Sequence, residues 1–356
     1  MRLPTKLSPN IRNIKRLFLG PGTIRSAARD IEVLCPEERG EFCPSIYLDG
    51  QLDKATGAAS GTELAAQLNP VTNRNVIHAP TIAYHIEKAV LTNGSIYSGN
   101  MKYFLHPMPL KSTKNAPVYM KKAALASTKL GTQFFGHWLK DDCAQYLLAA
   151  KHGAPVSVPP LYARVDQPEY ESLFSQNWSA TTEAQIDHLV IYQDFSQNSL
   201  KRHRYQLLAA CIRSRLVPKP PAFVYFKRGN TGVPRLIANE DEIIKTLSKE
   251  GFIVVDMASD SLETIITSLM DAKIIVTLEG SHLSHCWFSP ENRSGVVALQ
   301  PPDSFTSITK GWLDAVSARF GFVVGDGRDR STWFSVSDIL KTVDLMVSDL
   351  AQPRNH

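Results

Sequence analysis

The sequence predicts an α/β fold, and two observations in its C-terminal part carry this prediction. Short apolar runs recur there, and amphipathic stretches with helix-capping residues lie between them. Strands that alternate with helices in this way form parallel βαβ units with right-handed crossovers. The expected strands are residues 222–226, 252–255, 274–278, 295–299 and 322–324.

The longer helices expected between and after these strands begin at residues suited to a capping box. The capping pairs are Asn239 with Glu242, Asp260 with Glu263, and Ser335 with Asp338. These pairs open helices that end near residues 249, 270 and 350. A short helix is also expected after the strand at 274–278.

The first half of the chain is less regular. Strands are expected at residues 14–19, 90–105 and 189–192, an amphipathic helix at 137–151, and a mobile surface loop at 55–75. Three prolines, at positions 218, 220 and 221, make residues 219–221 the best candidate for a hinge. We therefore expect two domains, residues 1–217 and residues 218–356.

Composition narrows the class of protein. With 356 residues, 43% hydrophobic and 21% charged, the chain is typical of globular proteins, and its net charge of +5 suits an anionic ligand but does not argue for nucleic acid. Five scattered cysteines without CxxC spacing argue against a disulfide framework or zinc ribbon and for a cytoplasmic location. We find no apolar segment long enough to span a bilayer and no signal peptide. The basic residues up to Arg29 form either a solvated arm or a contact with an anionic membrane at its cytoplasmic face.

Two loops of the C-terminal part are expected to meet at one edge of the sheet. The segment Glu279-Gly280-Ser281-His282 follows the strand at 274–278, and a basic, glycine-containing loop with Arg228 follows the strand at 222–226. Because the carboxyl ends of parallel strands share an edge, these loops should emerge together. Guanidinium groups, glycines and a helix N-terminus favour a phosphate-bearing ligand, and Arg235 follows soon after. The alternative is a surface cluster of arginines.

The order Glu279, His282, His285 also invites comparison with a zinc site. The spacing is not HExxH, and positions i, i+3 and i+6 do not share one face of a helix. We therefore expect no metal here, and His285 is equally well interpreted as a hydrogen-bonded core residue.

A second cluster lies around His137, at the expected start of a helix. Asp141 and Asp142 follow it closely, and a carboxylate beside an imidazole is suited to general-base chemistry. The alternative is that the two aspartates only complement the helix N-terminus. The basic run 198–204 is expected to be a solvated helix start, although Lys201 and Arg204 could reach a phosphate.

In their order and spacing, these motifs resemble glycosyltransferase family 61. The matching residues are Gly136-His137-Trp138-Leu139 with Asp142, then Arg228, Arg235, Asn239 and Glu240, then Gly280-Ser281, and the strand that ends in Gln300-Pro301. The form EGSHLSH resembles a bacterial subgroup. Many members have histidine where Glu279 stands here, and glutamate where Ala298 stands.

This resemblance implies a GT-B fold, in which two Rossmann-like domains face each other across a cleft. Residues 1–217 would form the acceptor side and residues 218–356 the nucleotide-sugar side. It also implies inverting, metal-independent transfer of a hexose or pentose, without a cofactor, from a nucleotide sugar to a hydroxyl of a glycan. The donor is expected to be a UDP-sugar and the pathway surface polysaccharide (capsule or lipopolysaccharide) synthesis.

Under this interpretation, each candidate residue has a role. Arg228 and Arg235, with the amides of Gly280 and Ser281, would bind the diphosphate, and His282 the phosphate or the sugar. His137, supported by Asp141 or Asp142, is the first candidate for the base, and Glu279 is the second. The alternative function is a non-catalytic nucleotide- or glycan-binding module. A Rossmann dehydrogenase is disfavoured because no GxGxxG follows a strand.

Overall fold

The computed structural model describes residues 20–59, 61–108, 110, 116–229, 235–288, 294–327 and 331–352. The chain divides into two compact units. The first unit comprises Met1–Glu38 and His78–Cys211, and the second comprises Arg39–Ile77 and Ile212–His356. Among the described residues, none of the helices combines the length and apolar character needed to cross a bilayer.

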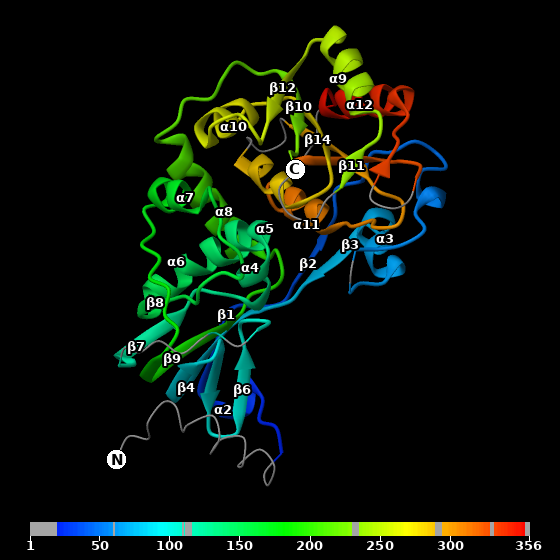
Figure 1. The fold of residues 1–356 in the computed structure, drawn as a ribbon. Coiled ribbons are helices and arrows are strands. Elements are labelled where there is room, and N and C mark those ends of the chain that lie inside the picture. Colours follow the sequence, from blue (N-terminus) through cyan, green and yellow to red (C-terminus); the bar gives the residue numbers. More distant parts are fainter. Residues whose placement is uncertain are drawn as a thin grey trace. The chain divides into compact units, whose positions relative to one another are not determined.

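The first unit contains a mixed sheet whose strands follow the order β6-β5-β4-β9-β7-β8, with β1 also paired to β4 (Figure 1). Only β9, β7 and β8 run parallel to one another. Alternating apolar residues of β4 and β9 build a buried core with β5 and β7. The strands are β1 Ala28–Cys35, β4 Thr81–Thr92, β5 Ser95–Ser98, β6 Met101–Phe104, β7 Val118–Leu125, β8 Ala154–Val156 and β9 Ala184–Gln193.

A series of helical segments follows β7 in this unit, interrupted at Phe134, whose backbone is extended. It contains α4 (Lys129–Gln133), α5 (Phe135–His137), a π-helical segment η2 (Trp138–Asp142) and α6 (Cys143–His152). In the π segment the backbone N–H of Cys143 donates to the carbonyl of Trp138, five residues back. Such segments are rare and often occur at functional sites. The remaining helices that begin in this unit are α2 Ile24–Ala27, α7 Gln167–Phe174 and α8 Ser199–Arg213.

The second unit is built on a parallel five-stranded sheet with the order β12-β10-β13-β14-β15. Counted along the chain, this order is 2-1-3-4-5, so the direction of winding reverses between β10 and β13. All residues of β13, β14 and β15 are buried, as expected for strands covered on both faces. The strands are β10 Phe223–Lys227, β12 Phe252–Asp256, β13 Ile274–Leu278, β14 Gly295–Gln300 and β15 Arg319–Val324.

Helices lie on both faces of this sheet. On one face α9 and α12 contact each other, and on the other α10, η3 and α11 do so (Figure 1). Ser335 caps α12 by accepting a hydrogen bond from the amide of Asp338. The helices are α9 Glu240–Lys249, α10 Leu262–Leu269, η3 Ser281–Phe288, α11 Ile308–Ala315 and α12 Val336–Leu350. Short elements complete the unit: η1 Leu52–Lys54, α3 Leu64–Thr72, and the paired strands β2 Glu38–Glu41 with β3 Asn75–His78 and β11 Leu236–Ile237 with β16 Ser331–Thr332.

The structure confirms the α/β class and the parallel βαβ units expected in the C-terminal part. Four local predictions were wrong. Asn239 precedes α9, but its side chain makes no capping hydrogen bond to the helix backbone. Segment 55–75 includes the helix α3, α10 is capped by Ser261 rather than Asp260, and the run 198–204 contains buried residues of α8. The strand expected at 14–19 lies outside the described residues. Because the first sheet is mixed, the GT-B arrangement and the roles assigned to the two domains stay predictions.

Candidate functional site

The reversal of strand order in the second unit brings together the polar ends of β10 and β13. In parallel α/β sheets, ligands bind at the carboxyl ends of the strands where the order reverses. Phe226 of β10 pairs with Thr277 of β13, so the residues that follow, Arg228 and Glu279, leave the sheet side by side. The prediction that these two loops share one edge is therefore confirmed.

Gly280 lies between two of the predicted donor-binding residues. A Cβ atom placed on Gly280 would lie 3.3 Å from Cζ of Arg228 and 3.2 Å from Nδ1 of His282. The missing side chain thus lets a guanidinium and an imidazole approach the same backbone position. Ser281 is exposed and begins η3, immediately after this position.

Arg235 also reaches this edge of the sheet. Its guanidinium donates from Nη1 to the carbonyl of Glu279, at 2.9 Å, and from Nη2 to Oγ of Ser304, at 3.1 Å. Burial, with the nearby charge of Arg235, lowers the pKa of Arg228 to about 10. Arg228 remains a cation at neutral pH. The charge of Arg235 disfavours its charged form and the charge of Glu279 favours it, so an anion beside the two arginines would be stabilised.

His282 has a defined tautomer. The Thr277 hydroxyl donates to the carbonyl of Phe226 at 2.7 Å, and Nε2 of His282 lies 2.7 Å from the same hydroxyl oxygen. Since the single hydroxyl proton is already used, Nε2 must carry the hydrogen and donate it to Thr277. Burial, together with the charge of Arg228, lowers the pKa of His282 well below its ordinary value. The ring is neutral, and Nδ1 is a buried acceptor without a partner among the described residues.

Glu279 is buried and bonded through both its backbone and its side chain. Its amide donates to Leu299 of the neighbouring strand at 2.9 Å, and Oε1 accepts from the hydroxyl of Thr309 at 3.0 Å. With the bond from Arg235 to its carbonyl, Glu279 connects β13, β14 and α11. Among the described residues, no group of three or more His, Cys, Asp or Glu side chains is arranged to hold a metal ion.

In the first unit, His137 pairs with Asp141 one helical turn away. Nδ1 of His137 lies 2.7 Å from Oδ2 of Asp141, and Nζ of Lys201 lies 2.6 Å from Oδ1 of the same carboxylate. Burial alone would raise the pKa of Asp141, but the charge of fully buried Lys201 and the bond from His137 outweigh it and hold that pKa well below its ordinary value. Asp141 is therefore ionised and fixes the orientation of the His137 ring.

Asp142 does not contact His137 through any hydrogen bond of the described structure. Its Oδ1 accepts from the amide of Thr128 at 3.0 Å and from the Thr128 hydroxyl at 2.7 Å, at the start of α4. A Cβ atom on Gly131 would lie 2.1 Å from this carboxylate, so only glycine fits there. Of the two carboxylates offered as partners for His137, the structure selects Asp141.

The sequence did not predict the burial or the hydrogen-bond partners of several of these residues. Lys201 and Arg204 were expected to be solvated, yet Lys201 binds Asp141, and Arg204 forms two hydrogen bonds of 2.8 Å with Asp194. Thr277 and Thr309, which orient His282 and Glu279, were not identified at all. A threonine in the middle of an otherwise apolar buried strand was the one signal that pointed to Thr277.

Comparison with known proteins agrees with the motif analysis. The family model Glycosyltransferase 61 matches residues 135–297, a segment that begins just before His137 and ends in β14. No curated protein matches the chain.

Two solved structures show a weak likeness. A mutant flavo di-iron protein from Thermotoga maritima has 11% identity and a TM-score of 0.28, covering 76% of this chain and 64% of its own. A metal-soaked flavodiiron core from Synechocystis has 12% identity and a TM-score of 0.24, covering 61% and 50%. This chain thus spans less than two thirds of either protein, and likeness at these scores carries no argument. The family match, in contrast, supports the glycosyltransferase 61 family for this chain and with it a glycosyltransferase activity.

Proposed function

We propose that this protein is an inverting, metal-independent glycosyltransferase of GT-B type. It transfers a hexose or pentose from a nucleotide sugar, in the first place a UDP-sugar, to a hydroxyl of a glycan. The observation that carries this proposal is the meeting of Arg228, Arg235 and His282 at the reversal of strand order, within the segment that matches the family. A place in bacterial surface-polysaccharide synthesis, in the cytoplasm or at the inner membrane face, is part of the same proposal.

The two arginines are assigned to the diphosphate of the donor. Guanidinium groups bind phosphate oxygens through paired, charge-assisted hydrogen bonds. When the bond between the sugar carbon and the phosphate oxygen breaks, its electron pair stays on the diphosphate. Arg228 and Arg235 offset that added charge, which is the part a metal ion plays in other transferases.

His282 is assigned to a hydroxyl of the donor rather than to phosphate. A neutral ring whose Nε2–H is already bonded to Thr277 offers only an acceptor at Nδ1. Phosphate oxygens are acceptors too, so they gain nothing from Nδ1. A sugar or ribose hydroxyl can donate to it. His282 would therefore favour a donor that has a hydroxyl group at this position.

His137 is assigned as the base that deprotonates the acceptor hydroxyl. Because the ionised Asp141 accepts from Nδ1, Nε2 is the basic nitrogen of the ring. The acceptor oxygen attacks the sugar carbon, its proton moves to Nε2, and Asp141 stabilises the imidazolium that forms. Lys201 keeps Asp141 ionised before the reaction. Glu279 stays the second candidate, although its carboxylate is already bonded to Thr309.

Incubation with UDP-, GDP- and CMP-sugars, with and without EDTA, tests this function. We expect slow hydrolysis of one donor class in both conditions, and transfer once an acceptor is added. Dependence on a divalent ion would contradict the metal-independent mechanism. Tight binding of a nucleotide sugar without hydrolysis or transfer would favour the non-catalytic binding module instead.

A further inference from the structure

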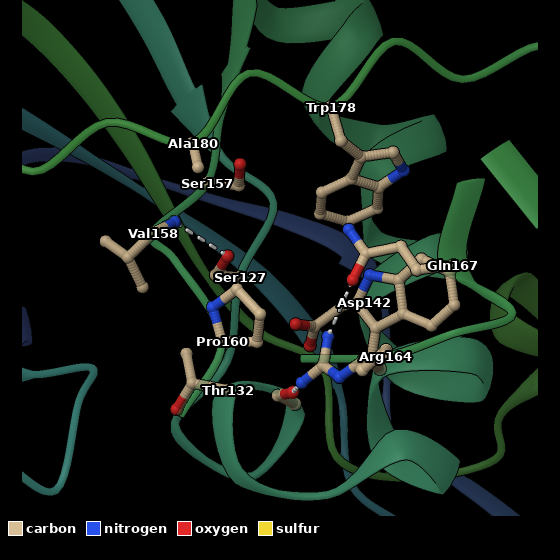
Figure 2. A pocket seen from close by; sticks show the side chains of 12 residues that line it. Ser127, Thr132, Asp142, Ser157, Val158, Pro160, Arg164, Gln167, Trp178 and Ala180 are labelled. Atoms are coloured by element: carbon tan, nitrogen blue, oxygen red, sulfur yellow. Dashed lines mark hydrogen bonds between the residues drawn. The ribbon is translucent and has the colours of Figure 1, made fainter. Parts of the chain in front are cut away.

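A cavity of about 40 Å³ lies in the first unit, behind the π-helical segment that carries Asp142 (Figure 2). Such a volume is large enough for two or three water molecules at about 15 Å³ each, or for one small polar group of a ligand. The residues that line it are Ser127, Gly131, Thr132, Trp138, Asp142, Ser157, Val158, Pro160, Arg164, Gln167, Trp178 and Ala180.

The polar groups of this cavity include more hydrogen-bond donors than acceptors. Trp138 is 2% exposed, and its Nε1–H has no acceptor among the described residues. Arg164 brings five N–H donors, of which the structure uses one on Gln167, at 3.4 Å, and one on the carbonyl of Gly131. The charge of Arg164 interacts with that of Asp142, but the two side chains form no ion pair of 4.0 Å or less in the described structure.

The serine and threonine hydroxyls at the wall do not offset the excess of hydrogen-bond donors in the cavity. Those of Ser157 and Thr132 donate to backbone carbonyls, and the hydroxyl of Ser127 accepts from the amide of Val158. Oδ1 of Asp142 already accepts from the amide and the hydroxyl of Thr128. Burial raises the pKa of this carboxyl well above its ordinary value, against the lowering effects of Thr128 and Arg164. The cavity is therefore suited to a group that only accepts hydrogen bonds and carries negative charge.

The walls favour a sugar as the bearer of that group. Trp138 and Trp178 pack with ring centroids 5.9 Å apart, and Trp178 is only half-buried, so its ring also faces outward. Arg164 lies 5.4 Å from the Trp138 ring, which fixes the guanidinium beside the indole. An aromatic face next to a small charged cavity fits an apolar sugar face whose carboxylate points inward.

We propose that this cavity binds the carboxylate of an acidic sugar through Arg164 and the Trp138 indole N–H. The sugar belongs to the acceptor glycan, and this last step rests on the transfer reaction proposed above. The binding itself does not depend on the donor or on catalysis. Binding and transfer can therefore fail independently of each other.

Nuclear magnetic resonance of the indole N–H groups tests the proposal directly. The chain has five tryptophans, so tryptophan-labelled protein gives five indole signals, and Trp138→Phe identifies the one at the cavity. Glucuronate and acetate should move the Trp138 signal downfield in a saturable way, glucuronate at lower concentration. Glucose should not move it. A Trp138 signal that stays in place with both carboxylates, or that moves equally with glucose, would overturn the proposal.

Arg164→Gln supplies the matched test of charge. We expect it to weaken glucuronate binding about tenfold or more, since it removes a charge-assisted contact. Lys151→Gln, which removes an exposed charge from α6 of the same unit, should leave binding unchanged. Equal affinity in wild type and Arg164→Gln would contradict the assignment. If Trp138→Phe proves unstable, calorimetry on Arg164→Gln and wild type decides the question alone.

Discussion

The charged clusters of the two units are built in opposite ways. In the first unit, opposite charges pair at short range: Lys201 with Asp141, and Arg204 with Asp194. At the strand reversal of the second unit, Arg228 lies beside Gly280 and Arg235 donates to the carbonyl of Glu279. The charge of Arg235 lowers the pKa of Arg228, against the opposing effect of the Glu279 carboxylate. Each cation of the first cluster has a carboxylate within 2.8 Å, whereas the second brings two arginines near one another, where an anionic ligand would be stabilised.

This difference fits the two roles proposed above, a base in the first unit and a diphosphate-binding site in the second. A paired cluster holds His137 in one orientation and keeps its carboxylate partner ionised, which suits a base. Two neighbouring arginines attract a ligand of opposite charge, which suits binding of a diphosphate. Four substitutions test whether the two clusters have these separate roles.

The largest expected effect is on transfer. His137→Ala should lower the rate of transfer about 10²–10⁴-fold, because a positioned general base contributes about that much. Nucleotide affinity should stay near the wild-type value, since the substitution lies outside the arginine cluster. The control is His203→Ala, at an exposed position of α8. Normal transfer in His137→Ala together with its loss in Glu279→Gln would reverse the ranking of the two bases.

The second largest effect is expected on the folding stability of the first unit. Lys201→Met removes the fully buried cation of an ion pair and leaves the mostly buried Asp141 without it, which should cost about 3–5 kcal/mol of unfolding free energy. Urea unfolding measures this, with exposed Lys151→Met as control. The double variant Lys201→Met, Asp141→Asn should recover part of the loss. No recovery would show that packing of Lys201, and not its charge, is what matters.

A smaller effect is expected on nucleotide affinity at the arginine cluster of the second unit. Arg235→Gln should weaken binding of a nucleoside diphosphate about 10–100-fold, equivalent to about 1.5–3 kcal/mol for hydrogen bonds to a charged group. Its folding stability should change little, because Gln can still donate to the carbonyl of Glu279. Calorimetry gives the affinities, and Lys245→Gln on the exposed face of α9 is the control. Unchanged affinity would remove Arg235 from the site.

The smallest effect is a pH dependence that comes from Asp142. Its pKa is raised in the folded state, so the stability it supplies is fully present below the ordinary value, about 3.9, and is lost as the pH rises toward the folded value. Asp142→Asn keeps a neutral side chain and should remove this loss. Unfolding free energies of wild type and variant from pH 4 to pH 8 should therefore diverge in favour of the variant. Parallel curves would mean that Asp142 is ionised in the fold.

Much of the second unit was predictable from the sequence. The strand Ile274–Leu278 and the helix Val336–Leu350 match their predicted bounds, since five consecutive apolar or β-branched residues and a strong capping pair leave little choice. The shared edge of β10 and β13 followed from topology alone. The cap of α10 failed because Asp260 instead accepts from the amide of Asp256, within the preceding turn.

The first unit was less predictable because its polar residues are buried by partners distant in the chain. From sequence, Lys201 and Arg204 resemble a solvated run, but in the structure they bond to Asp141 of the π segment and to Ala144 of α6. The π segment itself has no sequence signature, so the split between Asp141 and Asp142 could not be foreseen. Arg164 and Trp178 join Asp142 around one cavity only through tertiary packing.

Calorimetric titration of a nucleoside diphosphate against its matching nucleoside tests the central claim most directly. For the nucleotide class that binds best to wild type, we predict that the diphosphate binds at least about tenfold more tightly than the nucleoside. This advantage should vanish in Arg228→Gln, because the substitution removes the guanidinium charge that binds the diphosphate. Equal affinities of nucleoside and diphosphate for the wild type, or an advantage that survives in Arg228→Gln, would contradict the account.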